Sequence, residues 1–303
     1  MTTLHFTSQT LRDAQLLCGP DAHAPEVLLS GQWRAPALAQ TDQPLPVVVL
    51  VHGSNGVGAR EQGWAEVLNA HGLATFTLDC FSGRGIRSTA TDQTQLGRLA
   101  MVLDIYRAIE HLARQPQVDA RRVVVMGFSR GGQAALYSAL QRLRRLHARG
   151  PQGAPLTITA TLAFYPDCST TYLDDEAMAP EPIRVHHGEA DNYNPLAPCA
   201  AYVQRLAAAG ADIALHTYPD AHHVFDTPVG DGPVQSPQAQ SMRQCAWREV
   251  APGQIVHAQD GQPFSYEHPC VVRGTTQGPH PAAREAAQRA VLNFLRPLLG
   301  LAD

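Results

Sequence analysis

Residues 122–131 read Arg-Val-Val-Val-Met-Gly-Phe-Ser-Arg-Gly, and this stretch decides the fold. Its valine-rich half is typical of a buried strand, whereas the residues after Gly131 favour a helix. Gly127 to Gly131 fits the pattern Gly-x-Ser-x-Gly and lies at the strand-to-helix junction that this motif needs. Glycine permits a tight turn there, because a side chain would clash with neighbouring backbone. We predict that the turn holds Ser129 above a sheet edge as a nucleophile; the alternative is a chance match in a loop.

On both sides of this motif, short apolar runs alternate with amphipathic stretches. The predicted strands lie at 46–51, 73–78, 122–128, 156–164, 183–187 and 213–218. The predicted helices lie at 61–71, 95–114, 131–149, 200–209 and 284–299. Such alternation implies right-handed crossover connections and a mostly parallel sheet. We therefore predict an α/β fold with helices on both faces of a central sheet.

Two segments fall outside this alternation. Residues 1–45 are predicted to be irregular, with a weak strand near 26–33. Residues 227–280 are rich in proline, glycine and glutamine. A loop of that length without structure is uncommon inside a compact domain. We interpret it as an insertion with a short hairpin before the last helix, within one domain that spans 1–303.

A serine hydroxyl needs a base to become a nucleophile, and in this fold class the partners follow in the order serine, acid, histidine. Asp191 lies in the loop after the predicted strand 183–187, and Glu189 follows that strand too closely to be the better candidate. His223 follows the last strand, where apolar Val224 and its neighbour can bury the loop. We predict Asp191 and His223 as the partners; a solvated aspartate and a structural histidine are the alternatives.

An acyl-transfer site also needs N–H donors for the oxyanion of the tetrahedral intermediate. The backbone N–H of Arg130, next to the nucleophile, is one candidate, and the loop after the first central strand supplies the other. In that loop, residues 52–56, we predict the N–H of Ser54, with Asn55 close behind. The alternative is a surface turn, since Asn-Gly is itself a turn signal.

Taken together, these motifs resemble the dienelactone hydrolase family of α/β-hydrolases. The similar stretches are 52–56, 79–84, 127–132, 187–191 and 218–225. The resemblance implies a catalytic triad of Ser129, Asp191 and His223. Typical members use a cysteine nucleophile and a glutamate in the first loop, where this chain has Ser129 and Gly53. We therefore expect a serine carboxylesterase that cleaves an ester or lactone through an acyl-enzyme intermediate.

Further residues are candidates for contact with a small-molecule substrate. Arg84 and Arg87 could bind an anionic group, since guanidinium pairs well with carboxylate. His222 could flank the site, and Trp247 could belong to a lid or pocket wall. The alternatives are solvated arginines and a tryptophan packed elsewhere.

Three other functions use the same residues. A peptidase, amidase or acyltransferase can employ the same triad. A metal site could be built from four histidines at two strand ends, although adjacent histidines point to opposite faces of a strand. A non-catalytic binding module could retain the pocket. The four histidines are His186, His187, His222 and His223.

Composition narrows the classes of partner. The 303 residues carry a net charge of -4 with the two signs interspersed, which does not favour nucleic acid as a partner. We expect no membrane span and no cofactor, and a cytoplasmic location, or a periplasmic or secreted one if a signal peptide was removed. For the six cysteines we favour free thiols, with Cys18 and Cys80 buried. In an oxidising compartment, Cys168 could pair with Cys199 and Cys245 with Cys270.

Overall fold

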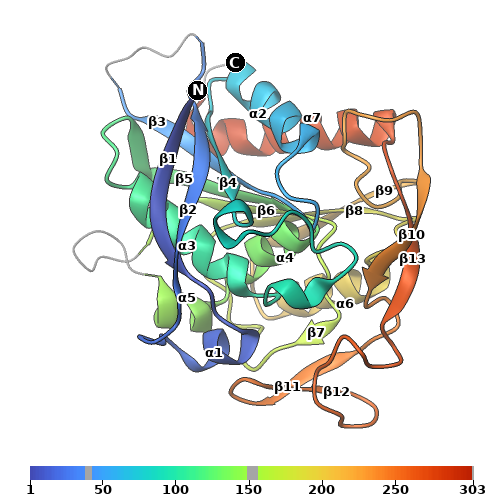
Figure 1. Cartoon of the computed structure of the whole chain (residues 1–303). Coiled ribbons are helices and arrows are strands. Elements are labelled where there is room, and N and C mark those ends of the chain that lie inside the picture. The colour runs from blue at the N-terminus through green and yellow to red at the C-terminus, as the bar shows by residue number, and fades with distance from the viewer. Residues whose placement is uncertain (38–42, 149–155, 302–303) are drawn as a thin grey trace.

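A central sheet of eight strands organises the computed structural model, which describes residues 1–37, 43–148 and 156–301 (Figure 1). The strand order is β1-β2-β4-β3-β5-β6-β8-β9. Strands β4 to β9 in this order are parallel, whereas β1 and β2 form an antiparallel edge. The predicted α/β fold is confirmed. The bounds are β1 (Thr2–Gln9), β2 (Glu26–Arg34), β3 (Leu45–Val51), β4 (Ala74–Asp79), β5 (Val118–Phe128), β6 (Ala160–Phe164), β8 (Ile183–Gly188) and β9 (Ile213–Tyr218).

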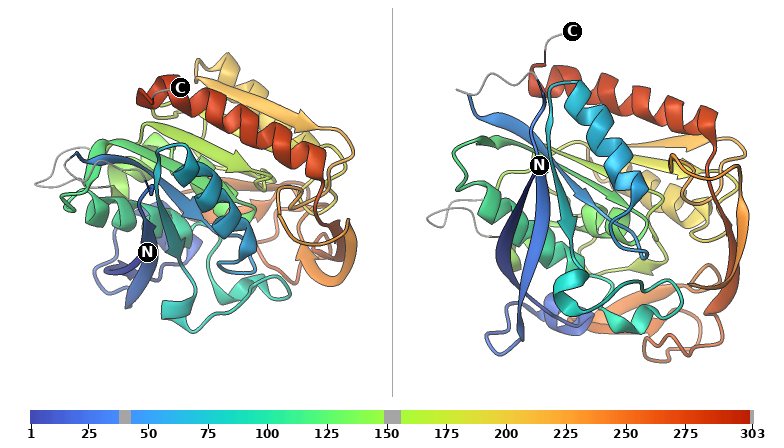
Figure 2. Two further views of the ribbon diagram at one scale, coloured as in Figure 1. Left: turned by 90° about the horizontal axis from the view of Figure 1, so that it is seen from above. Right: turned by 45° about the horizontal axis from the view of Figure 1, so that its top comes forward.

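Apolar strands are buried on both faces because helices cover both faces. In β3, Val47 and Val49 face one core cluster and Val48 faces the other, all fully buried. Helices α2 and α7 cover one face, and α3, α4 and α6 cover the other (Figures 1 and 2). No helix in the described ranges is both long and apolar enough to cross a membrane. The helices are α1 (Asp13–Cys18), α2 (Ala59–Ala70), α3 (Ala100–Leu112), α4 (Arg130–Tyr137), α5 (Gln141–His147), α6 (Leu196–Ala208) and α7 (Pro281–Leu299), with 3-10 turns at Ser82–Arg84 and Gln93–Gln95.

Two local predictions are wrong. The N-terminal segment contains β1 and α1 as well as the expected strand β2, so it is more regular than predicted. The predicted helix 131–149 is split into α4 and α5, and its end at Arg149 lies outside the described residues. The split follows from pairing with a distant segment, because Ala139 O accepts the Ala179 N–H at 2.7 Å. That partner lies too far along the chain for a helical pattern to reveal it.

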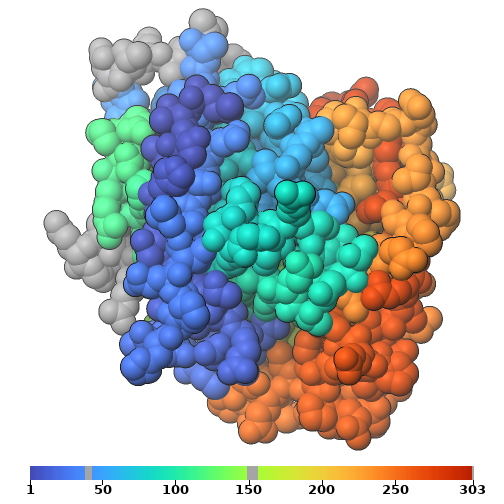
Figure 3. Space-filling model, viewed as in Figure 1, coloured from blue at the N-terminus to red at the C-terminus, as the bar shows by residue number. Residues whose placement is uncertain are grey.

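The segment between β9 and α7 is also more ordered than predicted. It forms a two-stranded sheet from β10 (Val234–Ser241) and β13 (Val272–Gln277). The expected hairpin consists of β11 (Trp247–Ala251) and β12 (Gln254–His257), with Gly253 in its turn at φ 74°. Strand β7 (Thr170–Thr171) pairs with β11, so the hairpin is anchored to the main body. In Figure 3 the segment's orange atoms form a continuous layer beside the blue and teal N-terminal half.

Two disulfides link cysteines that the preferred interpretation left free. Cys168 is bonded to Cys199, and Cys245 to Cys270. The expectation of free thiols is therefore wrong for these four, while the alternative pairing is the observed one. The sulfur of Cys80 is buried as expected, but Cys18 is exposed, because it ends the short surface helix α1.

Candidate active site

Ser129 occupies a strained turn between β5 and α4. Its φ of 55° and ψ of -115° lie outside the regions that L-residues ordinarily adopt. A Cβ atom at Gly127 would lie 2.0 Å from the carbonyl oxygen of Gly131, and one at Gly131 would lie 2.2 Å from that of Val51. Only glycine fits at either position, so the sequence motif is a packing requirement that places the serine over the sheet edge.

Ser129, His223 and Asp191 form a continuous hydrogen-bonded chain. Nε2 of His223 lies 2.9 Å from Oγ of Ser129, and Nδ1 lies 2.7 Å from Oδ2 of Asp191. The other carboxylate oxygen of Asp191 accepts the backbone N–H groups of Tyr193 at 2.8 Å and Asn194 at 2.9 Å. An ionised Asp191 therefore fixes the tautomer in which Nδ1–H donates to the carboxylate and Nε2 accepts from the serine hydroxyl.

Two tyrosines that sequence reasoning missed hold the imidazole of His223. The ring of Tyr193 stacks on it with centroids 4.6 Å apart, and the ring of Tyr165 meets it edge-on at 4.7 Å. Tyr165 directly follows β6 and has φ 37°. Its position just after a parallel strand is the sequence feature that could have identified it. Val224, beside the histidine, has φ 57°. The histidine loop is thus fixed by strained backbone and by aromatic packing.

A buried polar network lies beneath the histidine. Tyr165 donates to Asp226 at 2.6 Å, Trp64 donates to the same carboxylate at 2.7 Å, and Arg60 pairs with Glu61. Burial raises the pKa of Asp226 and that of the Tyr165 hydroxyl. Burial opposes the charge of Arg60, but Glu61, Tyr165 and Asp226 together raise the pKa of its guanidinium. The network leaves Arg60 charged close to the nucleophile.

Two narrow cavities meet at Ser129, each about 40 Å³ in volume, and both are also lined by Ser54 and Tyr193. The N–H of Arg130 is the first of helix α4 and has no partner within the helix. Asn55 lines the second cavity and accepts a hydrogen bond from Ser88 at 3.1 Å. Arg130 is thus adjacent to the serine in sequence, and Ser54 lines the same two cavities as the serine.

The first cavity has further polar lining that the sequence did not reveal. Arg98 donates to Asp167 at 2.6 Å, and the guanidinium of Arg130 donates to Gln93 at 2.8 Å and to backbone carbonyls. Nε2 of Gln133 is buried at the same wall and has no hydrogen-bond partner in the described part of the chain. Gln133 lies one helical turn after Ser129, which is the spacing that could have identified it.

Two predicted substrate contacts lie elsewhere. Arg84 forms a buried ion pair with Asp104, with two N–O contacts of 2.7 and 2.9 Å, and it lines neither cavity. Trp247 is 1% exposed and packs against Phe264, with ring centroids 4.8 Å apart. Both predictions are wrong, because these side chains fill structural positions that long-range packing creates. His222 flanks His223 in sequence but lines neither cavity.

The four histidines considered for a metal site do not converge. His186 stacks between the rings of Phe164 and His216, and its Nδ1 lies 2.7 Å from the hydroxyl of Tyr218. Both ring nitrogens of His223 are engaged by Ser129 and Asp191. Among the described residues, the one group able to offer three metal ligands lies in the segment 227–280 instead.

The eight-stranded sheet with a serine turn at its carboxyl edge defines an α/β-hydrolase fold. The model of the dienelactone hydrolase family matches residues 34–252, and the chain belongs to that family of hydrolases.

Solved structures share this fold. A putative dienelactone hydrolase from Klebsiella pneumoniae subsp. pneumoniae MGH 78578 is 14% identical with a TM-score of 0.60, over 97% of this chain and 99% of that one. Thermogutta terrifontis esterase 2 phosphorylated by paraoxon is 17% identical with a TM-score of 0.59, over 91% of each chain. A propionate-bound esterase from the same species is 19% identical with a TM-score of 0.50, over 65% of this chain and 80% of that one. At these identities the likeness concerns the fold.

Proposed function

We propose that this hydrolase is a serine carboxylesterase acting on small carboxylic esters or lactones through an acyl-enzyme intermediate. The observation that carries the proposal is the chain from Ser129 Oγ through His223 to Asp191, with contacts of 2.9 and 2.7 Å. That chain lies where two cavities meet, so a substrate carbonyl can reach the hydroxyl. Each group has a protonation role that its position permits.

In the first half-reaction, Oγ of Ser129 attacks the ester carbonyl while Nε2 of His223 takes the hydroxyl proton. Asp191 stabilises the imidazolium that forms, and the N–H groups of Arg130 and Ser54 hold the oxyanion. His223 then gives its proton to the departing alcohol. In the second half-reaction, His223 removes a proton from water, which attacks the acyl-enzyme. His223 then returns this proton to Oγ of Ser129 as the acyl–oxygen bond breaks and the carboxylic acid leaves.

The cavities favour a short acyl group. Each cavity, at about 40 Å³, has room for only a few water-sized groups, since roughly 10–15 Å³ on this measure is enough to hold one water molecule. Structures of the Thermogutta terrifontis esterase with propionate and with butyrate bound are consistent with short acids in this fold. We therefore propose acetyl to butyryl esters as the preferred class, with Asn55 near the entrance.

The surroundings of Ser129 differ from those of a cysteine nucleophile in typical family members. Gly53 stands where typical family members carry a glutamate, and a Cβ there would lie 3.3 Å from both Arg60 Nη2 and Ser129 Cβ. The group beside this nucleophile is thus the guanidinium of Arg60, which is itself paired with Glu61. Two disulfides support an oxidising compartment, periplasmic or extracellular, over the cytoplasm.

Hydrolysis of p-nitrophenyl esters from acetate to decanoate tests the proposal on the wild type and on Ser129→Ala. We expect kcat/KM to be highest for the two- to four-carbon acids and the variant to be inactive on all of them. Matched anilides distinguish an esterase from a peptidase or amidase, because an esterase turns them over far more slowly. Faster hydrolysis of the anilides, or wild-type rates in Ser129→Ala, would refute the proposal.

A further inference from the structure

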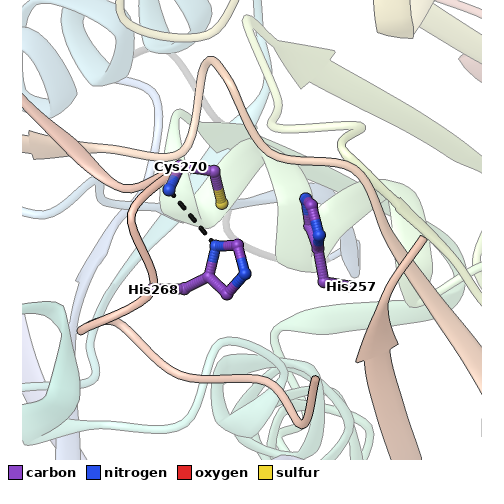
Figure 4. A group of neighbouring side chains, drawn as sticks. All are labelled: His257, His268 and Cys270. Atoms are coloured by element: carbon purple, nitrogen blue, oxygen red, sulfur yellow. Dashed lines mark hydrogen bonds between the residues drawn. The ribbon is translucent and has the colours of Figure 1, made fainter. Parts of the chain in front are cut away.

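A second cluster of chemically reactive side chains lies in the 227–280 segment and lines neither catalytic cavity. One ligand atom each from His257, His268 and Cys270 lies within 4.8 Å of the other two. Figure 4 shows the two rings and the Cys270 sulfur around a common space. Cys245 adds a second sulfur at the same place through its disulfide with Cys270. Two sulfurs and two imidazoles are the donor set that tetrahedral zinc prefers.

We propose that this cluster is a zinc site that alternates with the Cys245–Cys270 disulfide. A dithiol reductant delivers two electrons and two protons to the disulfide, which becomes two thiols while the dithiol itself is oxidised to a disulfide. Zn²⁺ then displaces both thiol protons and binds two thiolates and two neutral imidazoles. The two thiolate charges balance the ion, so the completed site adds no net charge to a largely buried place.

The histidines carry free or exchangeable nitrogen atoms at this place. Nδ1 of His257 is buried without a hydrogen bond in the described part of the chain, although Asp260 lies 3.1 Å away in poor alignment. Nδ1 of His268 accepts only the backbone N–H of Cys270 at 3.2 Å. A buried ring nitrogen that makes no hydrogen bond is costly, so binding a metal ion through the histidine would offset part of that cost. Ligands of tetrahedral zinc lie roughly 3.5 Å apart, so the imidazoles must approach the metal slightly, while the two sulfurs separate once their bond is reduced.

The surroundings match those of a structural metal site. Asp260 accepts from Nε2 of His268 at 3.0 Å, and this carboxylate–histidine contact leaves Nδ1 as the ligand atom. The ring of Trp247 lies 5.3 Å from each histidine ring, centroid to centroid, and limits access of water from one side. The other disulfide, Cys168–Cys199, belongs to no such group among the described residues.

The site would hold the part of the chain that completes the catalytic pocket. Met242 and Tyr266 line the first cavity, and they lie close in sequence to Cys245 and His268. The backbone N–H of Cys245 also donates to the carbonyl of Met242 at 2.8 Å. The disulfide would therefore keep this cavity wall in place under oxidising conditions, and the zinc ion would do so under reducing conditions.

The test uses the full-length chain in two redox states. The protein is reduced anaerobically with dithiothreitol, desalted, incubated with ZnCl₂, desalted again and assayed for metal by mass spectrometry. We expect one zinc per reduced chain and none on the oxidised chain. Cobalt in place of zinc should give thiolate-to-metal charge-transfer absorption and tetrahedral ligand-field bands. An oxidised chain that binds as much zinc, or a reduced chain that binds none, would overturn the proposal.

Matched variants assign the ligands. Cys245→Ser/Cys270→Ser and His268→Asn should lose the zinc, whereas Cys168→Ser/Cys199→Ser and the exposed His23→Asn should retain it. Asp260→Asn should weaken zinc binding about 10-fold or more through His268. Unchanged thermal unfolding of oxidised His268→Asn shows that the fold is intact. Zinc retained by the Cys245/Cys270 variant, or lost with the Cys168/Cys199 pair, refutes the assignment.

Discussion

The catalytic edge of the sheet and the 227–280 segment are fixed in different ways. At the edge, parallel strands and glycines without room for a Cβ determine where Ser129 lies, so local sequence specifies the geometry. The segment is instead held by contacts distant in sequence: the Cys245–Cys270 disulfide, the buried Trp247, and the ion pair between Arg142 and Glu249 at 2.7 Å. Chemistry therefore depends on the first region, and the pocket wall on the second.

Asp191→Asn gives the largest expected effect, and it should affect the chemistry alone. The amide cannot stabilise the imidazolium of His223 and favours the wrong tautomer, so kcat for a short ester should fall about 10⁴-fold. Thermal unfolding should change little, because the backbone N–H groups of Tyr193 and Asn194 keep an oxygen acceptor. A loss of kcat below about tenfold would mean that Asp191 does not orient the base.

Trp247→Ala should have a smaller effect than Asp191→Asn, and it should mainly lower the free energy of unfolding. Removing this 1%-exposed indole leaves a cavity between Phe264 and the two histidines, which costs about 3–5 kcal/mol of unfolding free energy. KM should rise more than kcat falls, since Phe264, which packs on Trp247, also contacts Tyr266 in the cavity wall. The half-exposed Val250→Ala on the same strand is the control and should change neither quantity. Urea unfolding and ester kinetics measure both.

Sequence patterns predicted the catalytic edge because each constraint there is short in range. Ser129 directly follows β5, and Asp191 and His223 lie in the loops after β8 and β9 of the same parallel sheet, so their order brings them together at one edge. Tyr193 escaped notice because its stacking on His223 depends on loop geometry. Arg84 was misassigned, since nothing near it in sequence marks Asp104 as its partner. Long-range pairing likewise set the break between α4 and α5 and the order within 227–280.

His186→Asn should produce the smallest effect, on the pH dependence of stability. Burial, followed by His216 and Arg184, lowers the pKa of His186 well below its usual value. The unfolded chain therefore binds the proton more tightly, so stability falls as pH drops below about 6.5, by up to about 1.4 kcal/mol per pH unit from this group. Chemical denaturation should show that the unfolding free energy of His186→Asn falls less between pH 6.5 and 5 than that of the wild type. The exposed His5→Asn is the control, and its unfolding free energy should fall as steeply as that of the wild type. Equal slopes in all three proteins would contradict this origin.

Labelling with a fluorophosphonate is the most direct measurement of whether Ser129 is an activated nucleophile. Native protein is treated with the probe, digested and analysed by mass spectrometry, with Ser129→Ala and heat-unfolded protein in parallel. We predict one label per native chain, on Ser129, and no label on the variant or the unfolded chain. An unlabelled native chain, or a label on another residue that persists in Ser129→Ala, would contradict the account.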